Sequence, residues 1–261
     1  MTSLCVPLTD IFRRNQDELL PLVDAVSFKE PTNEVFPGKE HMLECSLNVA
    51  DPEFARQLAD AGLLAALQTG RFTSFACDVG PAWAVVGHGK SPNGYPRYLP
   101  GTGPMTEEEY LSQAQKNVSF LRKQFSGKIK VENLNYFPSG GHEIVCEAGF
   151  IARIIRATGI ELLLDIGHLT ISMENLETTH EEYLDQLPLE TVSEVQISGS
   201  NILNGVWEDT HEVPNQRDFD LLDHLCQRTK AQYVTLEYYK DDRKLVDAYR
   251  KMAKLESLTT R

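Results

Sequence analysis

The chain has 261 residues, of which 41% are hydrophobic and 24% charged, and its formal net charge is −13. This length suits a single (β/α)8 barrel with a large core, and the negative charge argues against broad binding to nucleic acid. The five cysteines are scattered and form no CxxC pair, so neither a disulfide framework nor a structural zinc knuckle is expected.

The sequence carries no pattern that would direct the chain to or across a membrane. The N-terminus lacks the basic, apolar and small-residue succession of a secretion signal, and no apolar run approaches about 18 residues. We therefore expect a cytoplasmic protein in a reducing compartment, with no membrane partner.

Eight apolar segments of strand length recur along the chain, mostly separated by helical patterns. They span residues 3–8, 23–29, 42–47, 72–77, 128–134, 161–168, 192–198 and 232–239. The helical patterns cover about 10–20, 51–68, 106–125, 143–158, 180–186, 215 onward and 241–255. Residues 31–40 have no helical pattern, which departs from strict alternation. The whole predicts an α/β fold, a single TIM-barrel domain over residues 1–261.

Residues 81–104 interrupt the alternation with five prolines and five glycines. Long segments of this kind are often lids or binding loops, so we expect a lid-like loop here, with a solvated loop as the alternative. His88 is a candidate catalytic residue within it. Lys90 and Arg97 are candidates for binding a substrate carboxylate or phosphate, and Arg97 is also a candidate catalytic residue.

The segment ELLLDIGH, residues 161–168, shows how chemistry could be placed on this fold. Asp165 follows three leucines, where an unpaired carboxylate would be costly, so it needs a cation or several hydrogen-bond donors. His168 adds an imidazole, and divalent metals accept both groups. A structural histidine and a carboxylate bonded to a loop are the alternatives.

Other predicted strand ends carry similar residues. In a TIM barrel, functional side chains collect at the carboxyl ends of the strands and in the following loops. Most of the residues there are of metal-ligand types: Glu44, Asp78, Glu132, Asn133, Gln196, Asp209, His211 and Glu237. Their recurrence at one level of the barrel predicts a metal-binding site.

The motifs VENLNYFP, LLLDIGH, VSEVQISG, EDTHEV and TLEYY follow one another from Val131 to Tyr239. In this order they resemble the multinuclear non-haem iron-dependent oxidative enzymes of methanobactin and 3-thiaglutamate biosynthesis. That family lies within the xylose-isomerase-like barrel superfamily, which also contains the trinuclear-zinc endonuclease IV enzymes. The resemblance is clearest from Val131 onward.

The resemblance implies a ligand set. His168, Asp209 and His211 would hold one metal ion. Glu132 would bridge to a second ion bound with Asp165 and Glu237, and Gln196 takes the place of a histidine of the family. At a third position, Glu44 and Asp78 stand where the family has histidines; this position would hold a cation with Glu132 or be empty. Asn133 would contribute to substrate binding. Two iron ions are implied, with zinc or manganese as alternatives.

The function implied by the resemblance is an iron-dependent oxidase or oxygenase acting on a peptidyl cysteine-like thiol in natural-product biosynthesis. A peptide-recognition partner protein would be consistent with it. One alternative is a redox-neutral metal enzyme on the same barrel, either a sugar isomerase or epimerase, or a phosphoesterase. The other is a degenerate barrel that binds a small ligand or partner without catalysis. No nucleic-acid partner is expected.

Overall fold

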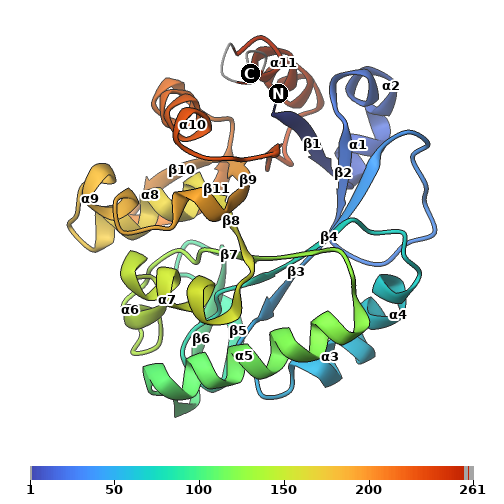
Figure 1. The fold of residues 1–261 in the computed structure, drawn as a ribbon. Helices are drawn as coiled ribbons and strands as arrows, with labels where there is room; N and C mark the ends of the chain where they lie inside the picture. The colour runs from blue at the N-terminus through green and yellow to red at the C-terminus, as the bar shows by residue number, and fades with distance from the viewer. Residues whose placement is uncertain (1, 256–257, 259–261) are drawn as a thin grey trace.

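The computed structural model describes residues 2–255 and residue 258, and its centre is a closed barrel of eight parallel strands (Figure 1). Around the barrel the strands run in the order β1-β12-β9-β8-β7-β4-β3-β2. Their bounds are β1 Ser3–Pro7, β2 Ala25–Phe28, β3 Glu40–Asn48, β4 Ser74–Asp78, β7 Lys128–Glu132, β8 Glu161–Asp165, β9 Val192–Ile197 and β12 Tyr233–Leu236. The predicted fold class is confirmed.

Helices cover the outside of the barrel (Figure 1). They are α1 Asp10–Arg14, α2 Gln16–Leu19, α3 Phe54–Asp60, α4 Leu63–Gln68, α5 Glu107–Gln124, α6 His142–Val145, α7 Ala148–Thr158, α8 Ile166–Asn175, α9 His180–Leu184, α10 Gln216–Arg228 and α11 Asp242–Met252. Two short 3-10 helices, η1 Leu20–Leu22 and η2 Leu189–Thr191, precede β2 and β9. Residues 29–39, between β2 and β3, contain no helix, as expected.

Local sequence signals set the ends of several helices. Thr106 and Glu109 form a capping box at the start of α5, and Gly159 in the left-handed conformation ends α7. The helix predicted over residues 51–68 is broken into α3 and α4, because Gly62 adopts a positive φ of 70° between them. The helical pattern was therefore recognised, but the break was not predicted.

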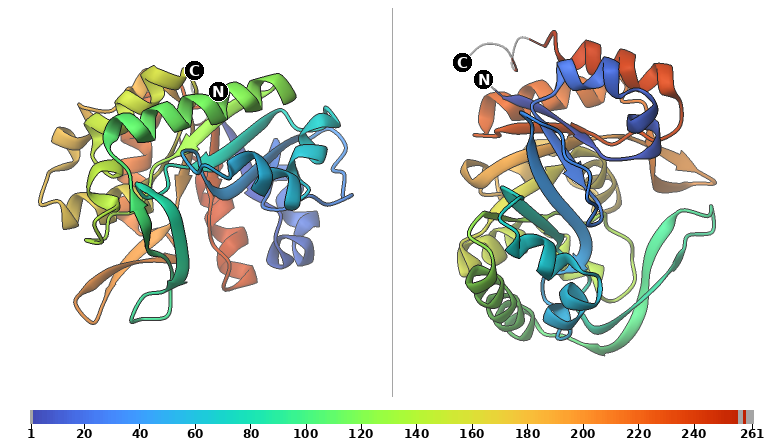
Figure 2. Two further views of the ribbon diagram at one scale, coloured as in Figure 1. Left: turned by 90° about the horizontal axis from the view of Figure 1, so that it is seen from below. Right: turned by 90° about the vertical axis from the view of Figure 1, so that its right-hand side faces the viewer.

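Two antiparallel hairpins project from the same end of the barrel (Figure 2). One consists of β5 Trp83–Lys90 and β6 Pro96–Pro104, so the loop predicted over residues 81–104 is wrong as a description of structure. Gly101 makes this pairing possible, because a Cβ there would lie 1.4 Å from the Val85 carbonyl oxygen. The other hairpin consists of β10 Gly199–Leu203 and β11 Val206–Glu212.

The barrel interior contains a buried ion pair between β7 and β9. Lys130 Nζ lies 2.5 Å from Glu194 Oε2, and each side chain is only 2% exposed. Thr235 donates a hydrogen bond to the other Glu194 oxygen at 2.6 Å. In the part of the chain that the structure describes, no helix is both long and apolar enough to cross a bilayer.

Candidate metal centre

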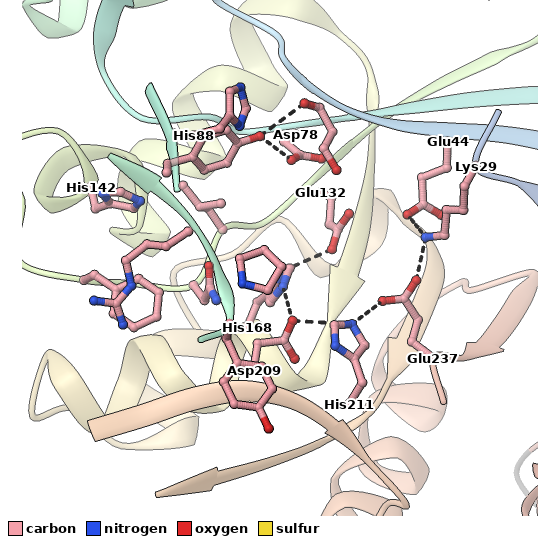
Figure 3. Close-up of a pocket in the computed structure, with 18 of the residues that line it drawn as sticks. Lys29, Glu44, Asp78, His88, Glu132, His142, His168, Asp209, His211 and Glu237 are labelled. Carbon is pink, nitrogen blue, oxygen red and sulfur yellow. Dashed lines mark hydrogen bonds and ion pairs between the residues drawn. The ribbon is translucent and has the colours of Figure 1, made fainter. Parts of the chain in front are cut away.

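The carboxyl ends of the barrel strands line a cavity of about 620 Å³, with the β5–β6 hairpin on one side (Figure 3). Most of the predicted site residues meet there. The acidic, basic and aromatic side chains that line it, histidines included, are Lys29, Glu44, Asp78, His88, Tyr95, Arg97, Tyr98, Glu132, Phe137, His142, His168, Asp209, His211, Glu237 and Tyr239. Asp165 and Gln196 lie buried behind this lining.

The end of β8 leads directly into helix α8, a transition that the sequence did not predict. The strand ends at Asp165, which caps α8 by accepting a 2.6 Å hydrogen bond from the backbone N–H of His168. His168 is therefore presented from the first turn of a helix and not from the strand. Asn133 exchanges two hydrogen bonds with the Asp165 backbone, at 2.7 and 3.1 Å. The Asn133 side chain thus fixes the position of Asp165. It does not line the cavity, where a residue that binds substrate would have to lie.

His168 lies at the centre of a group of carboxylates. Its Nδ1 is 3.1 Å from Glu132 Oε1 and 4.0 Å from Asp165 Oδ1, and its Nε2 is 3.4 Å from Asp209 Oδ2. One potential ligand atom from each of Glu132, Asp165 and His168 falls within 4.8 Å of the others. This spacing is compatible with donors around a single cation.

The β10–β11 hairpin delivers Asp209 and His211 to the same place. His211 has a positive φ of 45°, an uncommon conformation for a residue other than glycine and one often found at functional sites. Its Nε2 lies 3.4 Å from Asp209 Oδ2 and 3.1 Å from Glu237 Oε2. Asp209 Oδ1 is buried and has no hydrogen-bond partner among the described residues. Asp209 Oδ2 thus lies between the two imidazoles, and the partnerless Oδ1 of the same carboxylate is a further donor that fits a bound cation.

We call Glu132, Asp165, His168, Asp209 and His211 the histidine side of the centre. Across from it lies the lysine side, made of Lys29, Glu44, Asp78 and Gln196. Glu237 contacts both sides, because it accepts from Lys29 Nζ at 2.5 Å and pairs with His211. In Figure 3 the dashed contacts run without a break from Glu44 through Lys29 and Glu237 to the histidine side.

Lys29 is a site residue that sequence reasoning missed. Its ammonium is bonded to both Glu44 and Glu237, and Gln196 Nε2 donates to the second Glu44 oxygen at 2.8 Å. Tyr239, also missed, donates to Glu237 at 2.8 Å. The position of Lys29 directly after β2 is a signal that could have identified it, because the other site residues also lie at strand ends.

Asp78 has a hydrogen-bond partner different from that of Glu44. Tyr98 of the β5–β6 hairpin donates to Asp78 Oδ2 at 2.8 Å. In the described part of the chain, the group with metal-compatible spacing is Glu132, Asp165 and His168. Neither the predicted oxygen-only position formed by Glu44, Asp78 and Glu132 nor the predicted set of His168, Asp209 and His211 meets the same spacing. Lys29 and Tyr98 satisfy two of the three carboxylates of the oxygen-only position instead.

The histidine side is electrostatically unusual. Burial lowers the pKa of His168, but the Asp165, Asp209 and Glu132 carboxyl groups raise it well above its ordinary value. For His211, burial lowers the pKa and the Glu237 and Asp209 carboxylates raise it, to about 9 overall. Burial raises the pKa of Asp165 to about 6 despite the opposing effect of His168. Without metal, protonated imidazoles neutralise these carboxylates.

On the lysine side, burial lowers the pKa of Lys29, but Glu237 and Glu44 raise it well above its ordinary value. Burial raises the pKa of Glu44 to about 7, although Lys29 lowers it. Burial likewise raises the pKa of Asp78 to about 6, against the hydrogen bond from Tyr98. Lys29 therefore carries a fixed positive charge among carboxyl groups that would otherwise be costly to ionise.

Of the three candidate residues in the β5–β6 hairpin, His88 and Arg97 line the cavity and Lys90 does not. His88 lines the cavity and packs its ring 5.2 Å from that of Tyr98, but it is exposed. The Arg97 guanidinium lies 3.6 Å above the Phe137 ring and 3.5 Å from Glu208, at the cavity wall. Lys90 is exposed and outside the cavity lining. Whether the hairpin moves as a lid stays a prediction.

Solved structures share the architecture across the whole chain. An L-ribulose 3-epimerase superposes with a TM-score of 0.64 and 14% identity, covering 100% of this chain and 95% of that one. Endonuclease IV from Thermus thermophilus gives a TM-score of 0.58 and 14% identity, covering 96% and 99%. At this level of identity the likeness shows the fold alone.

Sequence comparison identifies the family. A UPF0276 protein of Caulobacter sp. (strain K31) is 31% identical over 157 residues, which cover 58% of this chain and 54% of that protein. The chain spans about half, or less, of the length of the curated relatives it matches. The family model for the RiPP precursor modification enzymes MbnB/TglH/ChrH matches residues 102–260, which include the whole histidine side and Glu237. These residues are more than half of the chain, which therefore belongs to the MbnB/TglH/ChrH family of RiPP precursor modification enzymes.

Proposed function

We propose that this chain is an iron-dependent oxidase or oxygenase that modifies a peptidyl cysteine-like thiol in natural-product biosynthesis. The observation that carries the proposal is that His168 Nε2 and His211 Nε2 each lie 3.4 Å from Asp209 Oδ2, while the other oxygen of this carboxylate is buried without a hydrogen-bond partner among the described residues. The family match supports modification of a RiPP precursor peptide as the reaction class.

The donor set also bears on the metal. Two imidazoles with carboxylates suit iron, zinc or manganese, and the histidine side has both kinds of ligand. Iron bound there would accept electrons from the thiol and pass them to dioxygen, which would be reduced as the thiol is oxidised. The proposed two-ion arrangement has one ion at His168, Asp209 and His211, and a second at Glu132, Asp165 and Glu237, the residue that contacts both sides.

The chain itself would bind and orient the substrate. The cavity of about 620 Å³ has room for a peptide side chain and its neighbours beside the histidine side. Arg97 at its wall, whose guanidinium stacks on the Phe137 ring and lies 3.5 Å from Glu208, is the candidate to pair with a substrate carboxylate. We further propose that the reaction is cytoplasmic and that a partner protein delivers the peptide. Nucleic acid and membranes have no part in this proposal.

Purification without oxygen tests the proposal directly. We expect the protein to retain iron, at about two ions per chain under this proposal, and to consume oxygen when a cysteine-containing peptide is added. Control variants Asp165→Ala and His211→Ala should lose both the metal and the oxygen uptake. Wild-type protein that holds no metal and does not modify the peptide, but binds it as tightly as both variants do, would contradict a catalytic metal centre and leave only a non-catalytic binding barrel.

A redox-neutral enzyme is the second candidate, because the carboxylates of the histidine side, Glu132, Asp165 and Asp209, also suit harder cations such as manganese. The likeness in fold to an L-ribulose 3-epimerase is compatible with it. Zinc or manganese in the purified protein, with epimerisation of a ketose or hydrolysis of a phosphoester and no oxygen uptake, would favour this candidate over the oxidase.

A further inference from the structure

The lysine side contains a cation of its own, and its neighbours are those expected around a metal ion. Lys29 Nζ sits between Glu44 and Glu237, whose side chains are 9% and 7% exposed. Two buried carboxylates this close to one group require a positive charge, because desolvation and mutual repulsion both disfavour the charged pair. The ammonium meets this requirement with no metal ion.

The contacts around Glu44 and Glu237 favour an ammonium group over a metal ion between them. Gln196 turns its Nε2 toward Glu44 at 2.8 Å, so it presents a donor where a metal ligand would present an oxygen. Ser27 at 3.4 Å supplies a further donor to Glu44, and Tyr239 one to Glu237. Every one of these groups neutralises or hydrogen-bonds a carboxylate. All four carboxylate oxygens of Glu44 and Glu237 have a partner, so none is free for a metal ion, and among the described residues the atom without a hydrogen-bond partner on this side is the buried amide oxygen of Gln196.

We propose that the Lys29 ammonium permanently replaces a metal ion between Glu44 and Glu237, and that metal binding in this protein is confined to the histidine side. The inference rests on the proposed metal centre but not on its substrate or redox chemistry. It predicts that the lysine side keeps its arrangement when metal is removed. It also predicts that loss of the ammonium opens a further metal position.

The Lys29→Met variant tests this by metal counting. Wild-type and variant protein are equilibrated with Mn²⁺, dialysed and analysed for bound manganese per folded chain. The variant should bind one ion more than wild type, and Lys29→Arg, which keeps the charge, should match wild type. The double variant Lys29→Met/Glu44→Gln should lose the added ion, because one of its two carboxylate ligands is gone.

Lys130→Met is a matched control elsewhere in the barrel. Lys130 is another buried lysine paired with a glutamate, but it faces only Glu194 and not two carboxylates. Its removal should leave the manganese count unchanged. Thermal unfolding of Lys29→Met gives a second readout: its midpoint should fall in chelator and recover with Mn²⁺ by more than that of wild type.

The outcomes separate the inference from the proposed function. Wild-type protein that binds no metal overturns the proposed function. Wild-type and folded Lys29→Met proteins that bind equal, non-zero numbers of ions overturn the inference alone. Crystals of wild-type protein grown with Mn²⁺ provide a test that needs no variant. Anomalous scattering should lie beside His168 and His211, and a peak between Glu44 and Glu237 would overturn the inference.

Discussion

The two sides of the cavity neutralise buried carboxylates by different means. On the histidine side, the imidazoles of His168 and His211 lie 3.1–3.4 Å from Glu132, Asp209 and Glu237 oxygens. On the lysine side, the Lys29 ammonium neutralises Glu44, the Tyr98 hydroxyl donates a hydrogen bond to Asp78, and the Gln196 amide donates one to Glu44. Both sides lie at the carboxyl end of the barrel, but different elements carry them. Helix α8 and the β10–β11 hairpin supply the imidazoles of the histidine side, whereas Lys29, Glu44 and Asp78 come from the ends of barrel strands.

This difference decides which side can hold a metal. An imidazole that loses its proton becomes a ligand, so a metal ion can take over the charge that the proton carried. An ammonium has no free lone pair and remains a cation at neutral pH. The histidine side can therefore exchange protons for metal, whereas the lysine side is already complete. The family model begins at residue 102 and matches the histidine side, and Lys29, Glu44 and Asp78 fall outside it.

The largest expected effect comes from removing a ligand of the histidine side. His168→Ala or His211→Ala should weaken Mn²⁺ binding by more than about 100-fold, because changes to groups merely supporting a ligand already cost 10–100-fold. Asp78→Asn on the lysine side should weaken it much less, since Asp78 is bonded to Tyr98. Isothermal titration calorimetry measures both.

Equal losses on the two sides would break the comparison. They would mean that Asp78 takes part in the same centre and that Tyr98 moves away when metal binds. The matched variant Tyr98→Phe distinguishes these cases, because it frees Asp78 without removing its charge. A gain in Mn²⁺ affinity in this variant would show that Asp78 competes for the ion.

The strand ends could be predicted from the sequence because their signal is local. A buried run such as Leu162–Leu164 followed by Asp165 indicates both a strand and its carboxyl end. The alternation of eight such segments then indicates a barrel, and the barrel predicts that Glu132, Asp165 and Glu237 meet. Composition and periodicity thus place these residues without any knowledge of long-range contacts.

The hairpins and the pairing of Lys29 were not predicted, for two physical reasons. Residues 81–104 are rich in proline and glycine, which usually indicate irregular structure, but here glycines let β5 and β6 approach. The turn at Asn204-Gly205, with φ of 52° and 77°, is a recognisable hairpin signal that was overlooked. The choice of Lys29 as partner of Glu44 depends on strand neighbours in space, which sequence alone does not specify.

A histidine outside both sides sharpens the comparison. His142 lies across the cavity, its Nδ1 is 2.5 Å from Ser139 Oγ, and aromatic rings surround it. Burial lowers its pKa to about 4, despite the nearby Glu143 carboxylate. The fold therefore favours neutral His142, whereas without metal the neighbouring carboxylates raise the pKa of His168 and His211 and favour their protonated forms.

This contrast has a consequence for stability in acid. An unfolded histidine has a pKa of about 6.5, above the folded value, so the contribution of neutral His142 is fully present above pH 6.5. It is lost as the pH falls from 6.5 toward 4, by up to about 3 kcal/mol. Denaturant unfolding at several pH values should show a smaller loss for His142→Gln than for wild type. An identical acid dependence would mean that His142 is not held neutral.

The smallest expected effect concerns the contact between the hairpins, which connects the two sides. Asn93 of the first hairpin donates to Leu203 O at 3.0 Å and Glu208 Oε1 at 2.9 Å, and accepts from Asn204 at 2.7 Å. Asn93→Ala should cost about 1–2 kcal/mol, since each partly exposed hydrogen bond contributes about 1 kcal/mol or less. Hydrogen–deuterium exchange should then increase in both hairpins.

Asn201→Ala is the matched control, because Asn201 bonds Thr210 at 3.3 Å within its own hairpin. It should increase exchange in β10–β11 alone. If Asn93→Ala leaves β10–β11 unchanged, the strained His211 is held by its own hairpin and by Glu237. If β10–β11 loosens, the segment that carries Asp209 and His211 depends on the hairpin that carries Tyr98, and the two sides are mechanically joined above the cavity as well as through Glu237.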